Sequence, residues 1–462
     1  MFPSQVYINR RKNLIKKVSG GLILITGNSE VPYNYKSNTY HFRQDSTFSY
    51  FFGLNEPNLC GVIDVDNDTA TIFGDNIDIE DIIWMGNLPS LEERAGKAGI
   101  KKTLPSRELA NNIKKAQGSG QKIHFLPPYR GENIILLGDL LGIPKSELAK
   151  VSSIELIKAV IDLRLLKDEY EIAEIEKMVE VAYQMHTYVM KSAKPGLNEK
   201  EIAGAIEGIA LSYANGVSFP IILSMNGETL HNHFHGNLLQ AGRLLITDAG
   251  AESEMCYASD ITRTIPVGGK FSLIQKDIYN IVLEANQKAI DITSPKIMYR
   301  EVHLTISKVI ANGLKNLGLM KGNVDDAVEA GAHALFFPHG LGHALGMDVH
   351  DLEGLGEDFV GYNDVLTRSN QFGLAYLRFA KRPEPGYVLT DEPGIYFIPE
   401  LIDLWKSEKK FIDFINYDKV EKLKGFGGIR IEDDILITEN GCRLLGKPIP
   451  KSVEEIEGMM RS

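Results

Sequence analysis

Apolar and polar positions in the first 150 residues change in short blocks, most of them the length of a strand. Apolar runs at 22–26, 59–65 and 69–73 indicate buried strands, and the acidic stretch 64–68 indicates the turn between the last two. Residues 106–116 have a helical pattern instead. This mixture predicts an α/β domain over residues 1–160.

Beyond residue 160 the apolar positions recur at helical spacing over much longer stretches. Asp168 can cap a helix whose apolar residues recur every three or four positions up to residue 189, before Pro195 and Gly196 end it. His186 lies on that apolar stripe and is interpreted as a core histidine. Further helices are predicted at 199–215, 273–292 and 300–316, and strands at 244–247, 257–267, 387–390 and 428–438. A helix pair followed by strands therefore occurs twice, which suggests a duplicated half-unit in a second domain, 161–462.

The segment 338–351 holds three of the eleven histidines, His339, His343 and His350, among three glycines. Each glycine would weaken a helix by about 1 kcal/mol relative to alanine, so we expect a tightly folded loop. Such a loop would present its imidazoles to a shared cavity, although a structural turn with hydrogen-bonded histidines is an alternative. Because no glutamate lies between the first two histidines, the segment is not the helical zinc motif of metalloproteases.

Four carboxylates lie at or near the ends of predicted strands: Asp248, Asp260, Glu392 and Glu432. An aspartate before glycine is most often a turn former, and Arg430 beside Glu432 could be only its ion-pair partner. Together with one histidine, however, the four carboxylates make an oxygen-rich set suited to Mn²⁺ or a similar ion. A single cation would leave excess negative charge, so two divalent cations about 3.5–4 Å apart are predicted.

Composition excludes several classes of function. A chain of 462 residues is expected to form two or three domains. The formal net charge of −11 argues against a general affinity for nucleic acid or anionic membranes. Three scattered cysteines argue against a disulfide framework, and no apolar run reaches the roughly 20 residues that span a bilayer. We therefore expect a cytoplasmic protein.

Five motifs, at 259–264, 338–343, 348–351, 392–396 and 428–432, resemble those of the proline-specific metallopeptidases with the pita-bread, or creatinase-type, fold. This family comprises aminopeptidase P and prolidase. The stretch 42–47 resembles the signature of their N-terminal domain. The resemblance implies an α+β protein, with a pita-bread catalytic domain at 161–462 behind an α/β creatinase-type N-terminal domain at 1–160.

The resemblance also implies the roles of individual residues. The metal ligands would be Asp248, Asp260, His343, Glu392 and Glu432. Asp260 and Glu432 would bridge two manganese ions, with cobalt or zinc as alternatives, and Glu392 would also transfer a proton. Residues that line the pocket and stabilise the carbonyl and the tetrahedral intermediate would be His231, His339 and His350. Arg378 and Arg430 would lie near the proline side of the substrate.

The implied reaction removes an N-terminal residue from peptides with proline in second position, as an Xaa-Pro aminopeptidase does. A prolidase, which cleaves only the dipeptide, is the alternative. A non-catalytic binding module is disfavoured because all five ligand positions are filled. The family further implies a homodimer or a higher homo-oligomer.

The chain departs from the family pattern in three places. Twelve positions separate Asp248 from Asp260, one more than the pattern, which predicts a looser hairpin. Val217 occupies the position of a family tyrosine. His233 and His235 alternate with His231, so all three imidazoles would share one face of an extended chain. We expect His233 and His235 to be solvated or locally hydrogen-bonded, with an accessory metal site as the alternative.

Overall fold

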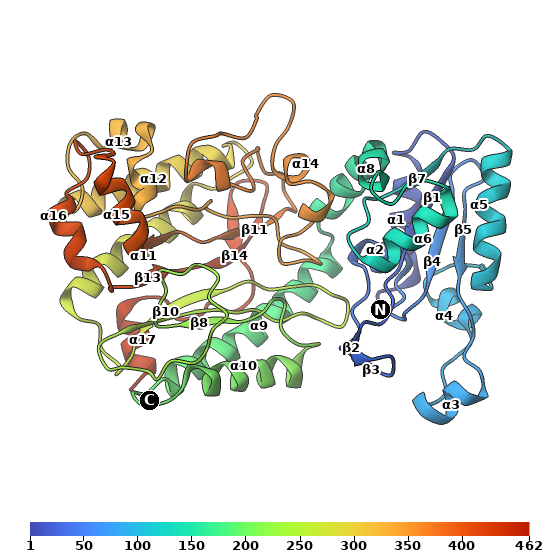
Figure 1. The fold of residues 1–462 in the computed structure, drawn as a ribbon, viewed down its shortest axis with the longest axis horizontal. Helices are drawn as coiled ribbons and strands as arrows, with labels where there is room; N and C mark the ends of the chain where they lie inside the picture. Colours follow the sequence, from blue (N-terminus) through green and yellow to red (C-terminus); the bar gives the residue numbers. More distant parts are fainter. Residues whose placement is uncertain (462) are drawn as a thin grey trace. The chain divides into compact units, whose positions relative to one another are not determined.

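A computed structural model describes residues 1–461 of the chain, which forms two compact units, Met1–Arg164 and Leu165–Ser462 (Figure 1). The first unit contains a five-stranded sheet in the order β6-β5-β4-β1-β7. Its strands are β1 (Leu22–Thr26), β4 (Cys60–Asp64), β5 (Thr69–Phe73), β6 (Lys102–Leu104) and β7 (Ile123–Phe125). β4 is antiparallel to both neighbours, whereas β6 and β7 run parallel to theirs. The predicted strands are therefore confirmed.

Two helices, α5 (Leu109–Gly118) and α6 (Gly131–Leu141), pack on this sheet through a cluster that includes Leu24, Val62 and Ile113. The helix predicted from residue 106 begins as a 3₁₀ turn, Ser106–Glu108, before α5. Arg10, Arg11 and Lys12 lie in α1 (Ser4–Ile15), a helix that the apolar pattern did not indicate. Arg11 there is buried and donates to the carbonyl oxygen of Phe51 at 2.7 Å, near the end of α2 (Ser46–Phe52). A cation at a helix C-terminus stabilises the exposed carbonyl groups.

The second unit repeats one arrangement, a helix pair followed by a three-stranded antiparallel sheet. The first set comprises α9 (Glu169–Ser192), α10 (Glu199–Tyr213), β8 (Ile222–Ser224), β9 (Leu244–Asp248) and β10 (Thr262–Pro266). The second set comprises α11 (Leu273–Ile292), α12 (Tyr299–Asn316), β11 (Val388–Asp391), β14 (Asp433–Ile437) and β15 (Cys442–Leu444). In Figure 1 the helices of each pair lie side by side. The predicted α+β class is confirmed.

The long helix α9 begins where the sequence predicted. The Asp168 side chain accepts hydrogen bonds from the backbone amides of Tyr170 and Glu171, and Glu171 bonds back to the Asp168 amide. This capping box satisfies amides that have no partner inside the helix. His186 is buried in the core, with Nε2 3.1 Å from the carbonyl oxygen of Ala249.

Two predicted strands were wrong in their extent. The strand predicted at 428–438 is two strands, because β13 (Gly428–Arg430) pairs with β12 (Gly394–Tyr396), whereas β14 pairs with β11. Glu432 lies in the break and forms a bridge to Thr262 on β10. The strand predicted at 257–267 begins only at Thr262, because residues before it bond to other segments, as the Ala258 amide does to Gly346. Asp260 and Glu432 therefore lie just outside strands.

The remaining strands are β2 (Pro32–Tyr35) and β3 (Asn38–Thr39). The remaining α-helices are α3 (Ile79–Met85), α4 (Leu91–Lys97), α7 (Leu148–Val151), α8 (Ile154–Leu165), α13 (Val324–Ala330), α14 (Glu357–Gly361), α15 (Pro399–Ser407), α16 (Tyr417–Val420) and α17 (Val453–Met459). Across residues 1–461, none of the helices combines the length and the apolar character needed to cross a membrane.

Candidate active site

The glycine-rich segment 338–351 contains no helix, as predicted, and part of it runs beside β11. The Leu345 amide donates to Val388, and the Thr390 amide donates to the carbonyl oxygen of His343, each at 3.0 Å. A Cβ atom at Gly342 would lie 2.0 Å from the Thr390 carbonyl oxygen, so only glycine allows this approach. The pairing places His343 next to the end of β11 and therefore close to Glu392.

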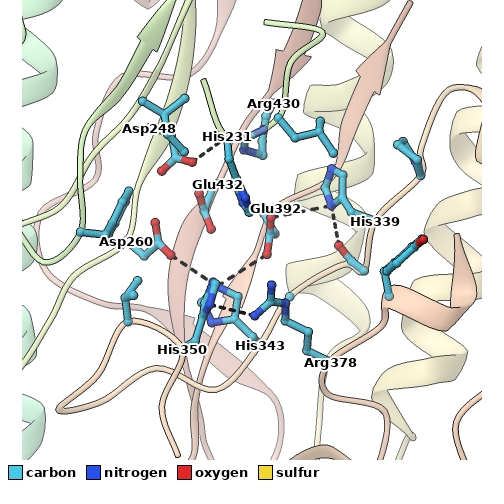
Figure 2. A pocket seen from close by; sticks show the side chains of 18 of the residues that line it. His231, Asp248, Asp260, His339, His343, His350, Arg378, Glu392, Arg430 and Glu432 are labelled. Carbon is cyan, nitrogen blue, oxygen red and sulfur yellow. Dashed lines mark hydrogen bonds and ion pairs between the residues drawn. The ribbon is translucent and has the colours of Figure 1, made fainter. Parts of the chain in front are cut away.

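Three buried residues, Asp260, His343 and Glu432, converge so that one ligand atom from each lies within 4.8 Å of the others (Figure 2). His343 Nδ1 lies 3.1 Å from the carbonyl oxygen of Ala344 and therefore carries the proton of the neutral ring. Its Nε2 lone pair then faces Asp260 Oδ2 at 3.4 Å and Glu392 Oε1 at 3.7 Å. A lone pair facing carboxylate oxygens is the arrangement of a metal-ligating histidine with its second nitrogen fixed by a backbone carbonyl.

Asp248 and Glu392 border the same group. Oδ1 of Asp248 is buried and accepts no hydrogen bond from the residues that the structure describes, whereas Oδ2 accepts one from Arg430 at 2.6 Å. Burial and the nearby Asp248 raise the pKa of Asp260 well above its ordinary value. Burial also raises the pKa of Glu392 to about 7, and burial together with Asp260 raises that of Glu432. Arg430 supplies one positive charge to the four carboxylates, so negative charge remains in excess, and their hard oxygen donors fit a divalent cation.

Arg430 connects the carboxylates to His339. Its guanidinium donates to Asp248, to Thr262 Oγ1 at 3.1 Å and to the Tyr396 hydroxyl at 2.8 Å. The Tyr396 hydroxyl lies 2.9 Å from His339 Nε2, and His339 Nδ1 lies 2.8 Å from the carbonyl oxygen of Gly340. The carbonyl requires a proton on Nδ1, so Tyr396 donates to Nε2. Burial lowers the pKa of His339 to about 3. His339 lines the cavity, but both of its nitrogens are already engaged.

His350 has the opposite arrangement. Its Nδ1 accepts a hydrogen bond from Arg378 at 2.8 Å, so the proton of the neutral ring is on Nε2. Burial lowers the pKa of His350 to about 2, which keeps the ring neutral. Arg378 also donates to Glu353 at 2.5 Å. Among these residues, His350 is therefore suited to donate a hydrogen bond to a substrate.

Of the three alternating histidines, His231, His233 and His235, two line the cavity and one does not. His231 and His233 line the cavity, and burial lowers the pKa of His231. His235 is not among the lining residues, and its Nδ1 lies 3.0 Å from the Leu223 carbonyl oxygen. Within residues 1–461, the one group of three or more residues with metal-binding geometry is that of Asp260, so the triplet forms no second one.

The cavity has a volume of about 810 Å³. It brings together all ten residues that the sequence singled out: His231, Asp248, Asp260, His339, His343, His350, Arg378, Glu392, Arg430 and Glu432. Its other walls are largely apolar, with Phe219, Leu230 and Phe372 among them. Ligand sites typically combine such apolar walls with a few convergent polar groups.

Sequence reasoning missed several residues that organise the site. Tyr396 and Thr262 lie within recognised motifs, and their hydroxyls could have been suspected for that reason. Glu353 contacts Arg378 across 25 positions of sequence, and no local pattern indicates that contact. Only the folded chain shows it.

Comparisons with known proteins agree with this geometry. A profile of metallopeptidase family M24 matches residues 173–439, and a profile of the aminopeptidase P N-terminal domain matches residues 7–124. The chain is 32% identical to the Xaa-Pro dipeptidase of Homo sapiens over 457 residues, covering 96% of this chain and 89% of the relative. It is 33% identical to a probable Xaa-Pro aminopeptidase of Aspergillus fumigatus over 437 residues, covering 91% of this chain and 88% of the relative.

Solved structures of aminopeptidase P are also similar to this chain. A variant of Escherichia coli aminopeptidase P in complex with substrate superposes with a TM-score of 0.83 at 29% identity, covering 100% of this chain and 98% of the other. The zinc-substituted form of that protein in complex with product has a TM-score of 0.82 at 29% identity, with the same coverage.

Proposed function

Because the chain belongs to metallopeptidase family M24, we propose that it is an Xaa-Pro aminopeptidase, which hydrolyses the bond between an N-terminal residue and proline. One observation carries the proposal. Asp260, His343 and Glu432 present ligand atoms to one point of a cavity large enough for a peptide. The names of the relatives supply the substrate class, N-terminal Xaa-Pro.

Five residues would hold two divalent cations: Asp248, Asp260, His343, Glu392 and Glu432. Manganese is the ion that we propose, with cobalt or zinc as alternatives, because carboxylate ligands predominate. Such ions, when bound, supply Lewis-acid activation of water and of the scissile carbonyl. The family resemblance assigns Asp260 and Glu432 as the shared ligands, and each presents a carboxylate oxygen within 4.8 Å of a ligand atom of His343.

The other residues would bind the substrate and move protons. Glu392 borders the cluster, so its carboxylate can carry a proton from the attacking water to the leaving proline nitrogen. His350 would donate from Nε2 to the oxygen of the scissile carbonyl, and His231 would stabilise the charge that develops there. Tyr396 and His339 would keep Arg430 in place beside Asp248. We also propose that the protein forms a homo-oligomer and is cytoplasmic.

An Xaa-Pro dipeptidase is the second candidate, and identity to the human dipeptidase favours it. The cavity favours the aminopeptidase. Its volume of about 810 Å³ lies in the upper part of the 300–1,000 Å³ that is usual for sites holding drug-sized ligands. A dipeptide is smaller than such ligands and would leave much of this space to water. A longer peptide would fill more of this volume.

Metal analysis and product analysis test the proposal. Active protein should contain two divalent ions per chain, lose activity to a chelator and regain it with Mn²⁺. Metal-replete protein should release the first residue from an Xaa-Pro-Xaa tripeptide. One ion or none in fully active protein would disprove the dinuclear site, and cleavage restricted to dipeptides would favour the second candidate.

A further inference from the structure

The cations that line the cavity are three arginines, Arg368, Arg378 and Arg430, and no lysine is among the lining residues that the structure describes. Each arginine is paired with at least one carboxylate. Arg430 is 2.6 Å from Asp248. Arg378 is 2.5 Å from Glu353. Arg368 lies 2.8 Å from Glu357 and 2.9 Å from Asp358. The cavity therefore offers its substrate no uncompensated arginine.

The pairing of these arginines affects how the cavity binds the group that follows the proline nitrogen and ring, which is a carboxylate or an amide. An Xaa-Pro dipeptide carries a free carboxylate on its proline, whereas a longer peptide has a neutral amide there. A carboxylate that leaves water needs a cationic partner, and arginine is the side chain best suited to it. A cation already neutralised by a protein carboxylate loses most of this advantage, because the two anions compete for one charge.

Arg378 is the arginine that a substrate carboxylate could best reach. Arg430 is buried and uses Nε, Nη1 and Nη2 on three protein groups. Arg368 holds two carboxylates and the carbonyl oxygen of Ala375. The Arg378 side chain is 30% exposed, and its contacts to His350 and Glu353 both use Nη1. Glu353 is less exposed, at 13%, and is not among the lining residues.

We propose that Glu353 is a specificity-determining residue, which neutralises Arg378 and so favours peptides that continue past proline over dipeptides. The inference rests on the proposed function and narrows its substrate class. Glu353 acts through Arg378 and touches no reacting atom. Because Arg378 also holds His350 Nδ1, the ion pair fixes the arginine in one position while it cancels the charge.

The experiment compares Ala-Pro with Ala-Pro-amide, which differ only in the charge beyond proline, and includes the tripeptide Ala-Pro-Ala. Wild-type protein should have a higher kcat/KM for the amide and the tripeptide than for the dipeptide. Glu353→Gln should lower the amide-to-dipeptide ratio of kcat/KM on the order of tenfold, the effect expected for one charge-assisted hydrogen bond. The change should appear as a lower KM for Ala-Pro. Any shared effect on turnover cancels in the ratio.

Three further variants separate charge from structure. Glu353→Asp retains the charge and should keep the wild-type ratio. Glu357→Gln is the matched control, because Asp358 still neutralises Arg368, so its ratio should also stay unchanged. The double variant Glu353→Gln/Arg378→Gln should not have the lower KM for Ala-Pro that is expected of Glu353→Gln. That result would show that the lower KM depends on Arg378.

Several results would overturn the inference. They are a wild-type preference for Ala-Pro, an unchanged ratio in Glu353→Gln, or an equal change in Glu357→Gln. If any of these accompanies release of alanine from Ala-Pro-Ala, the proposed function stands and only the role of Glu353 is wrong. If wild-type protein with its metals releases alanine from none of the three substrates, the proposed function falls as well.

Discussion

Glu432 and Asp433 are neighbours in sequence and equally buried, yet their surroundings are opposite. Glu432 faces Asp260 and Glu392, and burial together with these carboxylates raises its pKa. Asp433 accepts from Arg263 at 2.6 Å and from Lys451 at 2.7 Å. Burial alone would raise the pKa of Asp433, but these two cations hold it below its ordinary value.

The difference separates a carboxylate that is paired inside the protein from one that we propose as a metal ligand. Asp433 is neutralised by the protein itself, so it stabilises the fold without any external ion. Glu432 receives a hydrogen bond from Thr262 at 2.6 Å but has no lysine or arginine in ion-pair contact among the described residues. The protein therefore leaves the charge of its cluster to be balanced from outside. Glu432 lies between β13 and β14 and Asp433 begins β14, so one step along the chain separates the two environments.

The largest expected effect is a loss of turnover when a proposed metal ligand loses its charge. Asp260→Asn should lower kcat by more than the 10–100-fold typical of residues that only support a ligand, because an amide cannot supply two anionic oxygens. Its thermal midpoint without metal should not fall, since the variant loses a like-charge repulsion. Turnover near the wild-type value at saturating Mn²⁺ would show that Asp260 is not a bridge.

The same change of aspartate to asparagine at Asp433 should lower stability instead of turnover. Asp433→Asn leaves Arg263 and Lys451 without their carboxylate, and breaking a buried pair costs about 3–5 kcal/mol. Urea unfolding measures that loss, while metal analysis of the folded variant should still find the ions. Loss of metal at unchanged stability would mean that the two neighbours do not differ in role.

A substrate-facing residue should affect turnover and not metal content. His231→Ala should lower kcat about a hundredfold to a thousandfold, the cost of one lost oxyanion donor, roughly 2.7–4 kcal/mol. His235→Ala is the control, because His235 bonds to Leu223 outside the cavity lining. If both variants lose metal together, the triplet is a ligand set and the assignment of His231 fails.

The smallest effect, taken per unit of pH, concerns two buried histidines. His303 and His333 are buried, and neither ring has a hydrogen-bond partner among the described residues. Burial lowers the pKa of His303 to about 3 and that of His333 to about 4, from 6.5. The unfolded chain therefore binds more protons as the pH falls below 6.5, and stability is lost from there towards pH 4. Each histidine contributes about 1.4 kcal/mol per pH unit.

Replacing one of these bases tests that slope. His303→Phe should reduce the fall in unfolding free energy between pH 6.5 and 4, measured by urea titration at each pH. An identical slope in wild type and His303→Phe would show that His303 is not a buried neutral base.

Much of the fold was predictable because local chemistry and tertiary structure agree there. Asp168 caps α9 in a box that its own neighbour Glu171 completes, and the predicted helix 273–292 coincides with α11. The errors lie where another segment competes for the backbone. Residues 257–261 bond to Gly346 and Ala251 instead of extending β10, and no period along the chain indicates such partners.

The sequence by itself determined the five metal-ligand candidates and the fold class, since motifs with fixed residue types carried both. The tertiary structure alone decided which hydrogen bonds and ion pairs the site residues form. It ties both nitrogens of His339 to Tyr396 and Gly340, and it neutralises Arg378 with Glu353. Hydrogen bonds and ion pairs act over about 3 Å in space, whatever the separation along the chain. Contacts between distant segments therefore leave no pattern in a single sequence, and they decide which proton or charge remains available to a substrate.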